Sequence, residues 1–336
     1  MKMQKGLLLL GTVVLSILLT ACGSQEKKEA SSEGKLQVMT TFYPMYEFTK
    51  QVVGNKGEVE LLIPAGTEPH DFEPSAKDLA KISDSDVFVY NSPELETWTK
   101  NLTDTVDTKK TEIIQASKDI KLMEGTAHDH EDTHDHDSDE HDEHGHSHDL
   151  DPHVWLDPAL AIKEVETIRD QLSKKYPEDK AAFEKNASKY IEELKALDAD
   201  YQSAFKEAKN KTFVTQHAAF GYLANQYGLT QEAIAGISPD QEPSPSRLSE
   251  LKHYVEDHHV KVIYFEENAS SKVAETLSKE TGVKLEVLNP LESLTDKQLK
   301  NGENYVSVMR ENLDACLLYT SPSPRDYAAS RMPSSA

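Results

Sequence analysis

The sequence is poor in cysteine, in positive charge and in aromatic residues. Its 336 residues include two cysteines, Cys22 and Cys316, so the chain has no disulfide framework. The formal net charge is −23, which argues against a nucleic-acid partner because phosphate binding needs a basic face. Aromatic residues make up 7% and charged residues 28% of the chain, as expected of a surface-rich α/β protein. The length suffices for two ordinary domains.

Long apolar runs are also lacking, apart from one near the start of the chain. Leu7–Leu19 has 13 residues, too few to span a bilayer as a stable helix, and it follows two lysines as in a signal peptide. Leu19-Thr20-Ala21-Cys22 comes next and resembles the lipobox of bacterial lipoproteins. The resemblance implies a signal peptide over residues 1–21, lipid on the thiol of Cys22 and a polar tether over residues 22–35. The alternative is an ordinary signal peptide with a chance cysteine.

The most unusual stretch is residues 126–149, where histidines alternate with carboxylates and no lysine or arginine intervenes. It can be interpreted as a solvated acidic loop, but imidazole and carboxylate groups in this density favour contact with divalent metal ions. Because the stretch has almost no apolar residues to pack, we expect it to be mobile and its metal sites to be several and weak. Its histidines are His128, His130, His134, His136, His141, His144, His146 and His148.

Strand and helix patterns alternate through the rest of the chain, which predicts an α/β fold with mostly parallel sheets. We expect an N-terminal lobe over residues 36–177, a long linking helix over residues 178–209 and a C-terminal lobe over residues 210–314. The expected strands are 36–40, 59–63, 86–90, 111–115, 212–215, 231–237, 260–265 and 284–288. The expected helices are 43–53, 75–82, 94–102, 158–176, 178–209, 218–227, 246–257 with Ser246 as its N-cap, 270–281 and 303–313.

Residues 315–336 do not continue this pattern. They follow the last expected helix abruptly, have no periodicity and bring a free cysteine. They resemble translated adapter or frame-shifted DNA, so we interpret them as a non-native tail. Whether the native chain continues in another way at this point is left open.

Four candidate metal ligands lie at strand ends or in loops between a strand and a helix. In open parallel sheets such loops face the ligand crevice, and three imidazoles with one carboxylate make a tetrahedral zinc set. Taken singly, a histidine in such a loop is more often a structural hydrogen-bonding residue, and spacing alone does not select these four. His253, His258 and His259 are left out because they lie on or just after an expected surface helix. The four candidates are His70, His153, His217 and Glu292.

Six motifs carry a family resemblance. They are T-T-F-Y-P, G-T-E-P-H-D-F-E-P-S, D-P-H-V-W-L-D-P, F-V-T-Q-H-A-A-F-G-Y-L, Y-F-E-E-N-A-S and L-N-P-L-E-S-L-T. Together with the His-rich stretch before D-P-H, they resemble the zinc-binding solute-binding lipoproteins of ABC zinc-uptake systems, and most of all the streptococcal Adc type. The resemblance runs from about Lys35 to Leu313. It implies two lobes joined by a rigid helix, with His70, His153, His217 and Glu292 holding zinc in the cleft between them.

The resemblance also implies a function. The chain is expected to be a monomeric receptor, anchored by lipid on the extracellular face of the membrane, that captures Zn²⁺ and delivers it to an ABC permease. Manganese-type relatives place a carboxylate where His217 stands, which favours zinc. Closely similar streptococcal proteins carry a second zinc-binding domain after the last helix, where this sequence has its tail.

Two other classes of function compete with the receptor. A lipid-anchored zinc hydrolase would keep an open position on its metal and a nearby general base, and the sequence has no H-E-x-x-H motif. A metal-sequestering surface adhesin is the other class, although no repeat in the sequence points to a host ligand. We therefore expect a receptor and no enzymatic activity.

Overall fold

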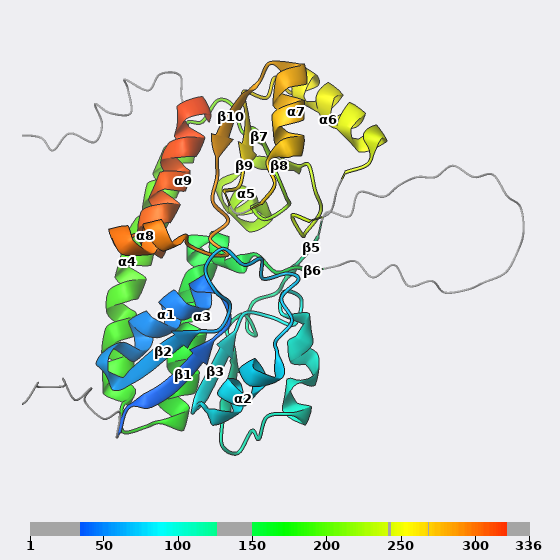
Figure 1. Cartoon of the computed structure of the whole chain (residues 1–336). Coiled ribbons are helices and arrows are strands. Elements are labelled where there is room, and N and C mark those ends of the chain that lie inside the picture. Colours follow the sequence, from blue (N-terminus) through cyan, green and yellow to red (C-terminus); the bar gives the residue numbers. More distant parts are fainter. Residues whose placement is uncertain (1–33, 126–149, 241–242, 268, 321–336) are drawn as a thin grey trace, which may run out of the picture. The chain divides into compact units, whose positions relative to one another are not determined.

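Two parallel sheets with flanking helices form the described part of the chain (Figure 1). The computed structural model describes residues 34–125, 150–240, 243–267 and 269–320. The expected signal peptide with Cys22, most of the tether, the His-rich stretch and the end of the tail lie outside these residues. Within the described ranges, no helix is long and apolar enough to cross a membrane.

The N-terminal lobe is built on a four-stranded sheet of order β2-β1-β3-β4, and every neighbouring pair in it is parallel. Its strands are β1 (Leu36–Thr40), β2 (Gly57–Leu61), β3 (Val87–Tyr90) and β4 (Glu112–Gln115), and its helices are α1 (Tyr43–Val53), α2 (Ala76–Asp84) and α3 (Pro158–Lys175). Successive side chains of a strand point to opposite faces. Val38 and Val89 therefore join the core that holds Phe48 of α1, whereas Met39 and Phe88 join the cluster that holds Ile82 of α2.

The C-terminal lobe repeats this plan with a parallel sheet of order β10-β9-β7-β8. Its strands are β7 (Thr212–Thr215), β8 (Thr230–Ala233), β9 (Val262–Phe265) and β10 (Lys284–Val287), and its helices are α5 (Gly221–Tyr227), α6 (Pro245–Asp257), α7 (Lys272–Thr281), α8 (Asp296–Asn301) and α9 (Tyr305–Thr320). Val214 and Ile263 are register partners in the sheet, and both pack with Leu251 of α6 and Leu277 of α7. The predicted pair of parallel α/β lobes is confirmed.

One long helix contacts both lobes. Helix α4 (Lys180–Lys206) has 27 residues, which corresponds to a length of about 40 Å. It lies against α1 and α3 of the N-terminal lobe and against α5 and α9 of the C-terminal lobe (Figure 1). Near its end, the buried hydroxyl of Tyr201 donates a hydrogen bond of 2.6 Å to the carbonyl of Met309 in α9. The predicted linking helix is thus present, with each end two to three residues inside the expected bounds.

Several predicted boundaries are wrong. The helix expected over residues 94–102 is instead a 3₁₀ helix, η2 (Thr97–Asp104). The segment has three threonines, and threonine has a low propensity for the interior of an α-helix. Helix α6 starts earlier than expected because Ser244, and not Ser246, is its N-cap, and Pro245 at the first position presets the helical φ. Five short elements were not predicted: η1 (Gly54–Lys56), η3 (Val154–Leu156), α8 (Asp296–Asn301) and the antiparallel pair β5 (Met123–Glu124) and β6 (Leu150–Asp151).

The last helix also runs further than the sequence pattern predicted. Helix α9 continues past Leu313 to Thr320, and Cys316 and Leu317 are buried in the main core. Leu313, Cys316 and Leu317 have the i, i+3, i+4 spacing that places side chains on one helix face. The first residues of the expected tail therefore extend the helix, and the non-native origin of the tail stays a prediction.

Candidate metal centre

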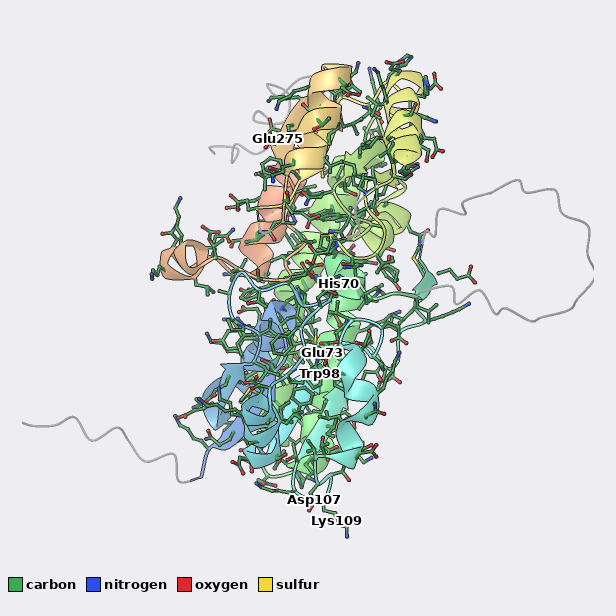
Figure 2. All side chains as sticks on the ribbon, turned by 45° about the vertical axis from the view of Figure 1, so that its right-hand side comes forward. His70, Glu73, Trp98, Asp107, Lys109 and Glu275 are labelled. Carbon is green, nitrogen blue, oxygen red and sulfur yellow. The ribbon has the colours of Figure 1, made fainter. Side chains whose placement is uncertain are left out.

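The four candidate ligands come together from two lobes. His70 lies in the loop between β2 and α2 (labelled in Figure 2), and His153 lies between β6 and η3. His217 follows β7, and Glu292 follows β10 in the C-terminal lobe. His70, His217 and Glu292 therefore follow strands of the two parallel sheets, and the carboxyl ends of parallel strands are where α/β sheets place their ligands. One ligand atom from each residue lies within 4.8 Å of the other three.

The distances between these atoms match a metal site. His153 Nε2 lies 3.2 Å from His70 Nε2 and 3.3 Å from His217 Nε2. Glu292 Oε1 lies 3.4, 3.4 and 3.3 Å from the Nε2 atoms of His70, His153 and His217. Bonds of ~2.0–2.1 Å around a tetrahedral zinc ion would separate neighbouring ligand atoms by about 3.3–3.4 Å. These five distances between ligand atoms thus agree with tetrahedral coordination of a small cation.

The ring of His153 is oriented by a carboxylate. Asp151 Oδ1 lies 2.7 Å from His153 Nδ1 and also accepts a hydrogen bond of 2.9 Å from the backbone N–H of His153. Because a carboxylate only accepts, the ring proton stays on Nδ1 and the lone pair on Nε2 faces the other ligands. Both side chains are buried, so neither turns freely toward water.

His217 has an equivalent partner in the other lobe. Its Nδ1 lies 2.5 Å from Oε1 of Glu266, the residue that follows β9. The backbone N–H of Glu266 in turn donates a hydrogen bond of 3.1 Å to the side chain of Gln216. His217, Glu266 and Gln216 are all buried. The carboxylate fixes the tautomer of His217, so that a second Nε2 lone pair faces the site.

The loop that presents Glu292 is strained and braced. Leu291 has φ 59°, a left-handed conformation that a leucine adopts at a cost of about 1–2 kcal/mol. The side chain of Asn289 accepts a hydrogen bond of 2.7 Å from the N–H of Leu291, and Asn312 of α9 bonds both the N–H and the carbonyl of Asn289 at 2.9 and 2.7 Å. Across the lobes, the indole of Trp155 donates to the carbonyl of Pro290 at 2.8 Å.

The charge balance of the site favours a cation. Oε1 of Glu292 is buried and lacks a hydrogen-bond partner among the described residues. When the imidazoles of His153 and His217 are neutral, their Nε2 lone pairs face Oε1 of Glu292 at 3.4 and 3.3 Å, so three acceptors converge. Convergence of acceptors in a buried place is unfavourable unless a proton or a metal ion is shared among them.

The pKa directions express the same balance for the metal-free site. Burial lowers the pKa of His217, but the carboxylates of Glu266 and Glu292 outweigh it and raise that pKa well above its ordinary value. Burial raises the pKa of Glu292, but the facing imidazoles, His217 first, lower it well below its ordinary value. For His70, burial dominates and lowers the pKa. Without a metal, both directions favour a protonated His217 beside an ionised Glu292.

A further carboxyl lies beside the site. Burial and the charge of Glu292 raise the pKa of Glu68 to about 8, although its side chain accepts a hydrogen bond of 3.1 Å from the N–H of His70. Glu68 therefore holds the loop of His70 in place. At neutral pH it adds little negative charge to the site.

Family motifs in the sequence indicated the four candidate ligands but not the carboxylates that orient two of their imidazoles. Asp151 and Glu266 lie inside quoted motifs, and a carboxylate two residues before a ligand histidine is a signal that could have indicated Asp151. Asn312 carries no such signal. His253, His258 and His259 are exposed and distant from the set of four, as expected. Cys22 and the eight histidines between His128 and His148 lie outside the described residues.

Fold and site together define a two-lobed metal-binding protein, and the chain belongs to the ZnuA family, the periplasmic component A of zinc-uptake complexes. The profile of this family matches residues 38–316. The chain is 56% identical over 313 residues to the zinc-binding lipoprotein AdcA of Streptococcus pneumoniae serotype 4, which covers 93% of this chain and 60% of the relative. The chain thus spans about three fifths of the length of that relative.

Two further comparisons cover nearly whole relatives. The high-affinity zinc uptake system protein ZnuA of Bacillus subtilis is 54% identical over 301 residues, which is 89% of this chain and 92% of the relative. The crystal structure of the Zn(II)-bound ZnuA-like domain of Streptococcus pneumoniae AdcA matches with a TM-score of 0.72 and 54% identity, over 85% of this chain and 99% of that domain. The AdcA domain structure shares the two-lobed fold described above.

Proposed function

We propose that this protein is a receptor that captures Zn²⁺ outside the cell membrane and delivers it to an ABC permease. The observation that carries the proposal is the convergence of His70, His153, His217 and Glu292 at mutual distances of 3.2–3.4 Å for the five measured pairs. Relatives named for zinc binding and zinc uptake support the choice of ion and of process. Lipid anchoring through Cys22 belongs to the same proposal.

The donor set supports zinc as the cargo. Three imidazole nitrogens and one carboxylate oxygen suit zinc, whereas manganese stands lowest in the order of affinities for such sites and prefers more oxygen ligands. Copper and nickel would also bind these donors, so selectivity in the cell comes partly from metal availability. The site binds its ion as cargo and needs no open coordination position.

The geometry of the described residues favours neither of the competing functions. A hydrolytic zinc would need a free position for water and a nearby general base, but a carboxylate completes the set of four here. An adhesin would offer an apolar patch, and among the described residues the only large apolar side chains that are exposed are Leu150 and Leu299. We infer that the protein is not an enzyme and that metal capture is its primary role.

Growth rescue tests the receptor function. A zinc-uptake mutant that produces the parent protein should grow in chelated medium, and added zinc should abolish the difference from a strain without it. A strain that produces His217→Ala should grow like the strain without the protein. Rescue by His217→Ala equal to rescue by the parent would contradict zinc capture at this site.

Zinc affinity should depend on pH through the neutral range. Because the carboxylates of Glu266 and Glu292 raise the pKa of His217 in the metal-free protein, zinc competes with a proton for this imidazole up to a higher pH than at an ordinary histidine. Affinity should therefore rise by up to about tenfold per pH unit while one proton is displaced, and level off above the raised pKa. Calorimetry between pH 6 and 8, in two buffers of different ionisation enthalpy, measures both effects. A flat affinity with no proton released would be inconsistent with a histidine-dominated site.

The His-rich stretch should not supply the tight site. The four ligand atoms already form a complete set without it. Deletion of His128–His148 should leave one tight zinc per chain and remove the weaker equivalents, with an effect on uptake only when zinc is scarce. Calorimetry on the parent and the deleted protein measures both classes of site. Loss of the tight equivalent on deletion would show that the stretch contributes a primary ligand.

A further inference from the structure

The hydroxyl of Tyr222 joins the C-terminal lobe to the segment that carries His153. Tyr222 lies in the first turn of α5 and is buried. Its hydroxyl donates a hydrogen bond of 2.7 Å to the carbonyl of Asp151 and accepts one of 2.7 Å from the N–H of Met123. Met123 and Asp151 are paired residues of β5 and β6. The hydroxyl of Tyr222 therefore bonds to both strands of the β5–β6 pair.

The neighbouring residue of α5 makes a second contact with the same segment. A Cβ atom added to Gly221 would lie 2.9 Å from Oδ2 of Asp151, closer than side chains normally approach. The helix thus abuts the carboxylate from one side, while Oδ1 of the same carboxylate bonds the ring and the backbone of His153. The absence of a side chain at position 221 is what leaves room for this arrangement.

These contacts form a continuous path to the metal centre. Tyr222 fixes the backbone of Asp151, Asp151 fixes the imidazole of His153, and Nε2 of His153 is one of the four converging atoms. The ring of Tyr222 also packs with Val154 and Ile120 in a small buried cluster. A two-stranded pair of two residues each has little stability of its own, so its position depends on such outside partners.

We propose that Tyr222 is a positioning residue for the ligand His153. Zinc retention then depends on the contact that Tyr222 makes between α5 and the β5–β6 strand pair. The inference rests on the proposed function, since it takes His153 as a zinc ligand. Separation of the lobes would move α5 away from the β5–β6 strand pair, break the hydrogen bonds of Tyr222 and free the backbone of Asp151. His153 would then lose its fixed orientation while zinc is released.

Two matched variants test this inference. Tyr222→Phe removes the bridging hydroxyl and keeps the ring that packs with Val154. Tyr227→Phe is the control, because Tyr227 lies on the same helix and its hydroxyl donates a bond of 2.9 Å to Asp198 of α4, away from the ligands. Zinc loaded on each full-length protein is transferred to a chelator in a stopped-flow instrument. Tyr222→Phe should lose zinc about tenfold faster than the parent, the lower end of the effect of groups that orient metal ligands.

The same experiment separates positioning from general stability. Tyr222→Phe loses two hydrogen bonds and Tyr227→Phe loses one, so the melting temperature of the metal-free protein should fall at least as far in Tyr222→Phe. Only Tyr222→Phe should change the dissociation rate and the Co²⁺ absorption spectrum. Equal dissociation rates for the two variants would overturn the inference even if the parent binds zinc tightly. A parent protein without tight zinc binding would overturn the proposed function and this inference together.

A variant at Gly221 tests the same inference by perturbing the carboxylate of Asp151 directly. Gly221→Ala places a methyl group against Oδ2 of Asp151, while alanine favours the helix more than glycine does. The metal-free protein should melt no earlier than the parent, yet zinc should dissociate faster. An unchanged rate in Gly221→Ala would count against the inference, and it keeps the test decisive if Tyr222→Phe folds poorly.

Discussion

His217→Ala is expected to reduce zinc affinity by a factor of a hundred to a thousand. Structural zinc sites bind with about 10–16 kcal/mol over four ligands, so one ligand corresponds to roughly 2.5–4 kcal/mol. His217 is fully buried, and its Nε2 lies 3.3 Å from both His153 Nε2 and Glu292 Oε1, so no other described side chain can replace it without movement. A competition titration against a chromophoric chelator measures the change.

A matched control for that experiment exists in the same lobe. His253 is exposed on α6, and His253→Ala removes one imidazole without touching the site. It should bind zinc like the parent protein. Zinc binding by His217→Ala as tight as that of His253→Ala would mean that the ion is bound elsewhere.

Glu266→Gln should weaken zinc binding by roughly ten- to a hundredfold. The substitution keeps the size of the side chain but removes the charge that holds the Nδ1 proton of His217 and makes its Nε2 a stronger donor to the metal. It should also lower the pKa of His217 in the metal-free protein, because the charge of Glu266 is the largest of the causes that raise it. The pH at which affinity levels off should therefore move down.

The neighbouring residue provides the control for this charge effect. Glu267 is exposed, and Glu267→Gln removes the same formal charge one position further along the chain. Its affinity should lie within about twofold of the parent, because exposed charges are well screened. If both variants weakened zinc binding equally, the effect would reflect net charge and not the hydrogen bond to His217.

Much of the fold follows from short-range patterns in the sequence. The strand expected over residues 86–90 is found as β3 inside the N-terminal sheet, where three buried residues in succession show that both of its faces are covered. The helices expected to end at residues 227 and 281 do end there, and the glycines that follow, Gly228 and Gly282, adopt the left-handed conformation. Boundaries were less predictable where two signals competed, as at Ser244 and Ser246.

The site could be predicted only in part, for a physical reason. The four ligands come from loops up to 222 positions apart in the chain, from His70 to Glu292, and no local pattern relates them. Motif resemblance supplied their identity, but the supporting contacts depend on packing. Asn312 braces the loop of Glu292 from α9, and Tyr222 reaches Asp151 from another lobe. Neither contact has a periodicity or a spacing that a sequence displays.

Competition between zinc and manganese, combined with elemental analysis of the purified protein, tests the central claim most directly. We expect one tightly bound zinc per chain at the set of His70, His153, His217 and Glu292, with any further equivalents weak. Manganese should displace that zinc only at an excess of about a thousandfold or more, since three imidazoles favour zinc strongly. Tighter binding of manganese than of zinc, or no tight equivalent at all, would contradict the assignment of this protein as a zinc receptor.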